Sequence, residues 1–238
     1  MRSLTFALSA LPALREATGA SDCDLAAAAI LAELAGVDAV RLGISEEQRP
    51  VRESDVMALR RSARRFELRM PACPTLQKIA LEARPDQVVL CGPVREPAGI
   101  ASPLDPRSQS NALVPLLRTL EDAGIEALLL VPPALDAVKA AHGLGARGVE
   151  LFAGAIVDLP ASERPAELER LGDAARLASK LRLPIGVSGG LGFRNLEEVL
   201  EAAPAAGRVV VGRSLTSRAL LVGIDRAVRD IQALVRRG

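Results

Sequence analysis

The sequence predicts one α/β domain, a single (β/α)₈ barrel (TIM barrel) over residues 1–238. Short aliphatic and β-branched runs alternate with longer amphipathic segments about eight times, without a break in composition. The length of 238 residues is also close to the ~250 typical of such barrels. A doubly wound open sheet would alternate in the same way, but the count of eight and the length favour the closed barrel.

Eight short segments are the predicted strands, namely residues 4–8, 39–44, 66–70, 87–91, 126–131, 148–152, 185–188 and 209–212. Gly36 sits where a helix C-cap glycine belongs, and Pro74 stands in the first turn of a helix. Residues 218–237 predict one long final helix. Residues 11–18 predict a short extra helix after strand one. Residues 92–110 form a long Pro-, Ser- and Gly-rich connection, of a length typical of lids, binding loops and mobile segments.

Composition and charge exclude several classes of partner. The chain is 49% hydrophobic and 25% charged, which is ordinary for a globular protein. Its 30 basic and 29 acidic residues give a net charge of +1, so no overall field attracts nucleic acid or an anionic membrane. Trp and Tyr are absent and Phe occurs four times, which leaves little surface for stacking nucleic-acid bases. Any anion must therefore be held by a local site.

Cysteine and histidine usage predicts neither a metal site nor a cofactor. Cys23, Cys73 and Cys91 form no CxxC pattern, so neither a disulfide framework nor a zinc site is indicated. His142 is the only histidine in the sequence and lies at a predicted helix C-terminus. Because a cation is favoured at that end of a helix, we interpret His142 as a surface or cap residue. The N-terminal segment is too short and polar for a signal peptide or membrane span. A cytoplasmic location is expected.

Two segments that follow predicted strands seven and eight carry the strongest local signal. They contain Ser188, Gly189 and Gly190, and Gly212, Arg213 and Ser214. Barrels often build a phosphate site at these loops from backbone N–H groups and a helix N-terminus, and glycine allows the phosphate to approach. Arg213 would add a positive charge and Ser214 a hydroxyl donor. The sequence thus predicts a small phosphorylated metabolite or inorganic phosphate as ligand. In the alternative interpretation the glycines only shape tight turns.

Four charged residues on predicted strands are expected to point into the barrel. They are Arg41, Glu67, Arg69 and Glu150. Because an isolated buried ion costs several kcal/mol, we predict that the four form an ionic network. In a catalytic interpretation Glu150 is a general acid or base and Arg69 clamps an anion or a carbonyl, with Arg41 and Glu67 as further pocket residues. In a structural interpretation the ionic network has no catalytic role, and the sequence leaves both interpretations open.

Several stretches, spread over nearly the whole chain, keep the order and spacing of one family. They are Leu14-Arg15 with Gly19 and Asp24, residues 32–38, Ser54-Asp55-Val56 through Leu59-Arg60, residues 122–125, Val149-Glu150-Leu151 with Gly154, Gly190-Leu191 with Asn195, and Val211-Gly212. In these stretches the chain resembles the pyridoxine 5′-phosphate synthase family (PdxJ-like), barrel enzymes of vitamin B6 biosynthesis. The resemblance implies a cofactor-free condensation of 1-deoxyxylulose 5-phosphate with 3-amino-2-oxopropyl phosphate. It also implies that Arg15 is a pocket residue and that the chain forms homo-oligomers through residues 11–18 or 92–110.

The resemblance further implies that most of the family's proton-transferring residues are replaced. The family's histidines and other polar groups correspond here to Ala7, Ser9, Ala10, Gly43, Ser45, Pro50, Arg69, Gly189 and Arg213. Each general acid or base supplies about 10²- to 10⁴-fold, so their loss should remove most of the rate enhancement, whereas phosphate capture needs only backbone and Arg. Three hypotheses stay open: a synthase-type enzyme with Glu150 as its proton shuttle, a non-catalytic binding or assembly protein, and a purely structural oligomer subunit.

Overall fold

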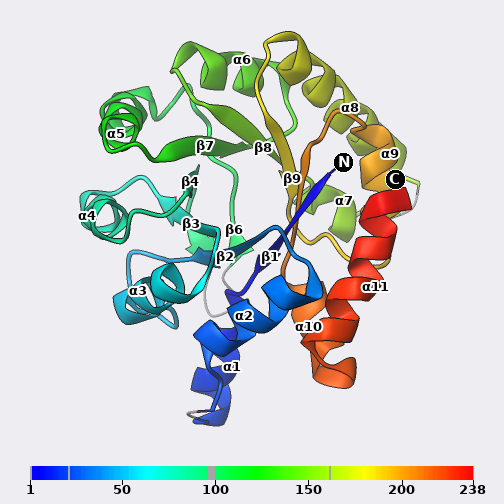
Figure 1. The fold of residues 1–238 in the computed structure, drawn as a ribbon. Coiled ribbons are helices and arrows are strands. Elements are labelled where there is room, and N and C mark those ends of the chain that lie inside the picture. Colours follow the sequence, from blue (N-terminus) through cyan, green and yellow to red (C-terminus); the bar gives the residue numbers. More distant parts are fainter. Residues whose placement is uncertain (1, 21, 96–99, 161, 238) are drawn as a thin grey trace.

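Eight parallel strands close into a barrel in the computed structural model, which describes residues 2–20, 22–95, 100–160 and 162–237 (Figure 1). The strands are β1 (Ser3–Ala7), β2 (Ala39–Gly43), β3 (Phe66–Pro71), β4 (Gln87–Cys91), β7 (Glu126–Val131), β8 (Gly148–Phe152), β9 (Ile185–Ser188) and β10 (Arg208–Val211). Each pairs with its neighbours in chain order, and β10 pairs with β1 to close the ring. The predicted fold is confirmed, and each predicted strand end lies within one residue of the observed end.

Helices surround the barrel, and their apolar faces pack on the strands (Figure 1). The outer helices are α2 (Leu25–Ala35), α3 (Glu53–Ser62), α4 (Pro74–Ala83), α5 (Ser110–Asp122), α6 (Leu135–Gly143), α8 (Arg164–Lys180), α9 (Leu196–Ala202) and α11 (Ile224–Arg237). The extra helix after the first strand is present as α1 (Ala10–Thr18). Gly36 ends α2 with a φ of 111°, and Pro74 opens α4, as predicted. No described helix is both long enough and apolar enough to cross a membrane.

The C-terminal segment differs from the prediction. Residues 218–237 do not form one helix, because α10 (Arg213–Val222) ends at Gly223 and α11 begins at Ile224. Gly223 has a φ of 81°, a conformation that favours glycine and cannot continue a right-handed helix. The helix α10 also begins earlier than predicted, at Arg213 immediately after β10, at the mouth of the barrel. A second unpredicted helix, α7 (Gly154–Asp158), follows β8 at the same end.

The long connection after β4 folds back over the barrel end. It contains a two-stranded hairpin, β5 (Val94–Arg95) with β6 (Ile100–Ala101), and residues 96–99 lie outside the described residues. Gly92 N donates to Ser102 O, and Leu104 N donates to Leu130 O at the end of β7, both at 2.9 Å. Ala101 and Leu104 are buried. The second half of this connection is therefore anchored to the barrel wall.

A cluster of charges lies inside the barrel below its mouth. Arg41 on β2 donates to both oxygens of Glu150 on β8 at 2.7 Å and to Glu67 on β3 at 2.8–2.9 Å. All three residues are fully buried. Thr5 donates a hydrogen bond to Glu67, and Arg208 Nε lies 3.7 Å from the same carboxylate. The predicted network is therefore present for Arg41, Glu67 and Glu150.

Arg69, the fourth residue of the predicted network, lies higher in the barrel than the other three. It is two residues beyond Glu67 on β3, and its guanidinium packs on Gly43 at the barrel mouth. Its charge still lowers the pKa of Glu150. Arg208 on β10, which the sequence analysis did not select, lies near Glu67 as an additional positive charge. The length of each arginine side chain and the stagger of the strands determine which arginine lies near which buried carboxylate.

Replacing Arg41 tests the cluster. Arg41→Met leaves two buried carboxylates without their main counter-ion, so we expect the free energy of unfolding to fall by about 3–5 kcal/mol in denaturant titrations followed by circular dichroism. Arg229→Met, which breaks an exposed ion pair with Asp225, is the matched control and should change the midpoint little. Equal losses in the two variants would contradict a stabilising role for the cluster.

Candidate functional site

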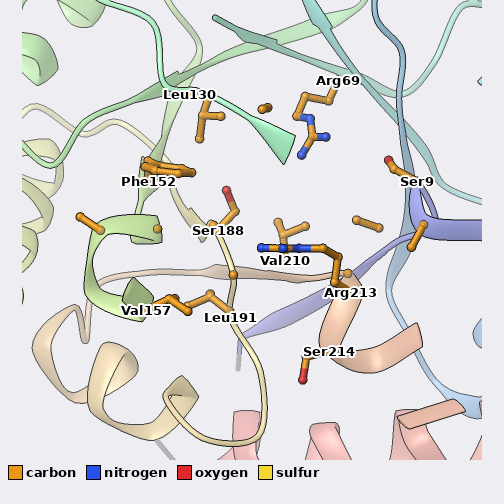
Figure 2. Close-up of a pocket in the computed structure, with 18 residues that line it drawn as sticks. Ser9, Arg69, Leu130, Phe152, Val157, Ser188, Leu191, Val210, Arg213 and Ser214 are labelled. Carbon is orange, nitrogen blue, oxygen red and sulfur yellow. The ribbon is translucent and has the colours of Figure 1, made fainter. Parts of the chain in front are cut away.

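A pocket of about 550 Å³ opens at the C-terminal ends of the strands, where barrel proteins place their functional loops (Figure 2). Its wall comes from the ends of β1, β3, β7, β8, β9 and β10 and from the segments that follow them, with Ala101 from β6. The polar side chains that line it are Ser9, Arg69, Ser188, Arg213 and Ser214, and the larger apolar ones are Leu130, Phe152, Val157, Leu191 and Val210.

The turn after β9 is shaped by two glycines in conformations that L side chains rarely adopt. Gly189 has a φ of 101° and Gly190 a φ of 72°. A Cβ on Gly189 would lie 2.8 Å from the backbone N of Gly154, so the turn packs directly on the start of α7. Asn195 fixes the loop beyond it by accepting from Gly192 N at 2.9 Å and donating to Gly190 O at 3.2 Å. The glycines thus shape a tight turn and also bring its backbone to the pocket wall.

The turn after β10 leads straight into a helix. Gly212 is the N-cap of α10, and a Cβ there would lie 3.2 Å from Ala7 on the neighbouring strand. The first N–H groups of α10 have no acceptor within the helix and carry a partial positive charge. Arg213, the first helical residue, is exposed, and Figure 2 shows its side chain reaching into the pocket. This end of the pocket is electropositive and can receive an anion.

The two glycine turns lie against each other. A Cβ on Gly192 would be within 2.4 Å of the Ser214 side chain, so the β9 loop and the start of α10 are in direct contact. In Figure 2 Ser214 points away from the centre of the pocket, whereas Ser188 and Arg213 point into it. The structure therefore brings together all six residues that the sequence analysis assigned to phosphate binding, from Ser188 to Gly190 and from Gly212 to Ser214.

Arg69 lines the pocket from another side. Its guanidinium occupies the space above Gly43, where a Cβ would lie 2.6 Å from Arg69 Nη2 and 3.2 Å from Cζ. Ser9, which follows β1, is buried and accepts a hydrogen bond from Gly43 N at 2.9 Å. Arg69, Gly43 and Ser9 thus form one contiguous part of the wall.

Glu150 lies below the pocket and not in its described lining. Burial by itself would raise the pKa of Glu150, but the charge and hydrogen bonds of Arg41, with a hydrogen bond from Ser188, outweigh it and hold the pKa below its usual value. The carboxyl group is therefore ionised at neutral pH and already accepts several hydrogen bonds. These contacts favour the structural interpretation of the buried charges, and Ser188 is the link between Glu150 and the pocket.

Arg15, Arg41 and Glu67 do not belong to the described pocket lining. Arg41 and Glu67 are part of the buried charge cluster with Glu150. Arg15 on α1 donates two hydrogen bonds of 2.8 Å to Asp55 on α3 and one to Pro50 O. Burial acts to raise the pKa of Asp55, but these hydrogen bonds from Arg15 and one from Arg52 N lower it overall. Arg15 thus ties two segments of the barrel mouth together.

Cysteine and histidine side chains provide no reactive group in the described pocket wall. Burial raises the pKa of the Cys91 thiol to about 12, so the thiol is neutral at physiological pH. His142 is exposed in the last turn of α6, where the sequence analysis expected a cap residue. Among the described residues, no group of three or more His, Cys, Asp or Glu side chains could hold a metal ion.

Sequence reasoning did not select Phe152 or Ser9 as pocket residues. Phe152 is the last residue of β8, and its ring packs between Gly154 and Gly189. Ser9 lies two residues beyond the end of β1. Both follow the general position of functional residues in barrels, at or just after the C-terminal end of a strand, and that signal would have identified them.

Substituting Gly189 tests the geometry of the β9 turn. Gly189→Ala must adopt an unfavourable φ and place its Cβ against backbone, so we expect a loss of about 1–3 kcal/mol in the free energy of unfolding and a distorted pocket wall. Gly207→Ala is the control, because its Cβ would meet nothing within 4 Å. Thermal and chemical unfolding measure both variants, and a Gly189→Ala protein as stable as Gly207→Ala would contradict the assigned backbone conformation.

Comparison with known proteins places this chain in one family. The family model described as pyridoxal phosphate biosynthesis protein PdxJ matches residues 4–237. The chain is 35% identical over 224 residues to a pyridoxine 5′-phosphate synthase of Desulfatibacillum aliphaticivorans, with 94% of each chain covered. It is 32% identical over 237 residues to one of Synechococcus sp. CC9605, covering 99% of this chain and 95% of that one.

Solved structures show the same fold at low sequence identity. A thiamine phosphate pyrophosphorylase from Pyrococcus furiosus superposes with a TM-score of 0.64 at 15% identity, covering 99% of this chain and 96% of that one. The tryptophan synthase α-subunit of the same organism gives a TM-score of 0.62 at 16% identity, covering 98% and 97%. These likenesses concern the barrel alone, whereas the family match extends over nearly the whole sequence. The chain belongs to the PdxJ family of pyridoxal phosphate biosynthesis proteins.

Proposed function

We propose that this PdxJ-family barrel binds a small phosphorylated ligand, or inorganic phosphate, with the phosphate at the start of α10. One observation carries the proposal: the Gly189–Gly190 turn and the Gly212–Arg213 segment line the same pocket and contact each other through Gly192 and Ser214. The N-terminus of α10 supplies backbone donors with partial positive charge, and Arg213 adds a full charge. Relatives are named pyridoxine 5′-phosphate synthase, which agrees with a phosphate ester as ligand.

We further propose that the condensation implied by the family is lost or strongly reduced. That reaction requires several proton transfers, and the described pocket wall contains two guanidinium groups and three serine hydroxyls but neither an imidazole nor a carboxylate. A guanidinium stays protonated at physiological pH and cannot act as a general base. Glu150 is ionised below the pocket and engaged with Arg41. These features support ligand binding more strongly than turnover.

A residual synthase-type activity is the second candidate, and one contact favours it. Ser188 lines the pocket and hydrogen-bonds Glu150, so a proton could pass between the ligand and the buried carboxylate through this hydroxyl. In this candidate function Arg69 would polarise a carbonyl or clamp an anion of the substrate.

Self-association and a cytoplasmic location remain proposals. The predicted contact segments were residues 11–18 and 92–110. The large exposed apolar side chains of the described chain lie elsewhere, at Ile30, Leu31 and Leu34 on α2, Leu135 on α6, and Leu220, Leu221 and Val222 on α10. Light scattering on the purified protein measures the subunit number.

Phosphate binding is tested by thermal unfolding. At a hundredfold excess of inorganic phosphate over its Kd we expect the melting temperature to rise by roughly 5–10 °C. Arg213→Met should remove most of this rise, whereas Arg118→Met, which deletes an exposed charge on α5, should keep it. Matched chloride concentrations control for ionic strength, and an equal rise with chloride or in Arg213→Met would contradict the proposal.

Turnover is tested separately from binding. This protein and the pyridoxine 5′-phosphate synthase of Geobacter metallireducens, 35% identical over 226 residues, are assayed side by side with the two substrates implied by the family. We expect at least about a 10²-fold lower rate here, because the loss of even one general acid or base has an effect of that size. Comparable rates would show that the condensation is retained.

A further inference from the structure

We propose that Arg164 and Glu198 are positioning residues for the phosphate site, although neither belongs to the described pocket lining. The pair lies outside the pocket and fixes α7 relative to the loop after β9, so that the backbone of the Gly189–Gly190 turn is held in place for a ligand. This inference rests on the proposed phosphate site and adds the residues that hold its wall. It follows from the contacts of α7, from the position of Asn195 and from one ion pair between α8 and α9.

The helix α7 forms one side of the pocket and packs against the β9 turn. Gly154 and Val157, both on α7, line the pocket. A Cβ on Gly190 would lie 2.9 Å from Val157 Cγ2. A Cβ on Gly189 would lie 2.8 Å from the backbone N of Gly154. Figure 2 shows Val157 on the same side of the pocket as Leu191 of the β9 loop. A shift of α7 would therefore change the space around both glycines of the turn.

The two ends of α7 are held in different ways. Its start is fixed to the barrel, because Ala153 N donates to Ser188 O at 2.7 Å and the Ile156 side chain is buried. Its end is followed by Leu159, whose carbonyl oxygen accepts a hydrogen bond of 3.2 Å from Arg164 Nε. Arg164 is the first residue of α8, so this hydrogen bond ties the segment after α7 to the next helix. Arg164 is thus placed to set the position of the C-terminal end of α7.

The same guanidinium also reaches α9, the helix that follows the β9 loop. Arg164 Nη1 lies 3.5 Å from Glu198 Oε1. That carboxylate oxygen is buried and accepts no hydrogen bond from the described residues. Because opposite charges attract each other more strongly where water is excluded, this ion pair is expected to hold its geometry better than a fully exposed pair. Arg164 therefore connects the end of α7 to α9.

The helix α9 carries the other half of this arrangement. Asn195 is its N-cap residue and donates a hydrogen bond of 3.2 Å to Gly190 O, and Glu198 is the third residue of the same helix. One short helix thus joins the side chain that holds the β9 loop to the side chain that pairs with Arg164. The contacts run from Gly190 through α9 and Arg164 to α7, and Val157 returns to Gly190. Breaking this closed series at Arg164 should let α7 and the β9 loop move independently and misplace the amides that meet the phosphate.

The affinity for inorganic phosphate tests the positioning role by isothermal titration calorimetry. Arg164→Met removes both the hydrogen bond to Leu159 O and the ion pair with Glu198. We expect the Kd to rise about 2- to 30-fold, the range for residues that act on a site without contacting its ligand. Arg164→Lys keeps a charge beside Glu198 and should give an intermediate Kd. Arg170→Met, which breaks an exposed ion pair with Glu167 on the same helix, is the matched control and should leave the Kd within about twofold.

Two further measurements separate positioning from a general loss of stability. If Arg164 and Glu198 act as a pair, the double variant Arg164→Met, Glu198→Gln should weaken phosphate binding no more than Arg164→Met alone. Hydrogen–deuterium exchange should be faster in Arg164→Met at the amides of residues 154–159 and 189–192, while the amides of β2 and β3 keep their wild-type rates. Circular dichroism and melting temperature confirm that each variant is folded.

The outcomes separate this inference from the proposed function. If phosphate binds and Arg164→Met keeps the Kd within about twofold, Arg164 is not a positioning residue and the phosphate site stands. Losses that add in the double variant, or faster exchange throughout the barrel, would also overturn the assignment. If the wild-type protein does not bind phosphate, the proposed function fails together with the inference.

Discussion

The buried guanidinium of Arg41 is the interaction on which the interior of this barrel depends. It lies between two carboxylates from strands on different sides of the ring, Glu67 on β3 and Glu150 on β8, and none of the three side chains is exposed. Buried ions are costly unless their hydrogen bonds are satisfied, and here four hydrogen bonds join them. The cluster therefore links β2, β3 and β8 and forms a polar floor below the pocket.

The buried charge cluster limits the chemistry that the pocket above it can support. Arg41 keeps Glu150 ionised despite its burial, so this carboxylate, which Ser188 links to the pocket, is poorly suited to donate a proton. The pocket wall itself contributes guanidinium, hydroxyl and backbone amide groups, all of which can stabilise negative charge. Binding an anion and transferring protons make different demands on a site, and the groups present here meet the first demand more fully. This difference is the physical basis for proposing that the chain binds a phosphorylated ligand and has lost most of the condensation activity.

Glycine has a separate role at each place where the pocket wall is built. Gly189 and Gly190 adopt backbone conformations that bring the β9 turn against α7, and Gly192 lets that loop meet the start of α10. Gly43 leaves the space into which Arg69 folds. The position of both arginine side chains in the pocket therefore depends on neighbouring residues that have no side chain.

The sequence alone determined the fold and the two glycine-rich segments that line the pocket, because both are encoded locally. Alternating strand and helix patterns placed all eight strands within a residue, and the glycine-rich turns after the last two strands identified Gly190 and Gly212 as neighbours in one pocket. Contacts between distant segments required the tertiary structure. Arg41 and Glu150 are 109 residues apart, Arg208 approaches Glu67 although the sequence analysis did not include it in the network, and Arg15 pairs with Asp55 outside the pocket lining. Periodicity predicts which face of a strand a side chain occupies, but the stagger of the strands and the reach of each side chain decide which charges meet.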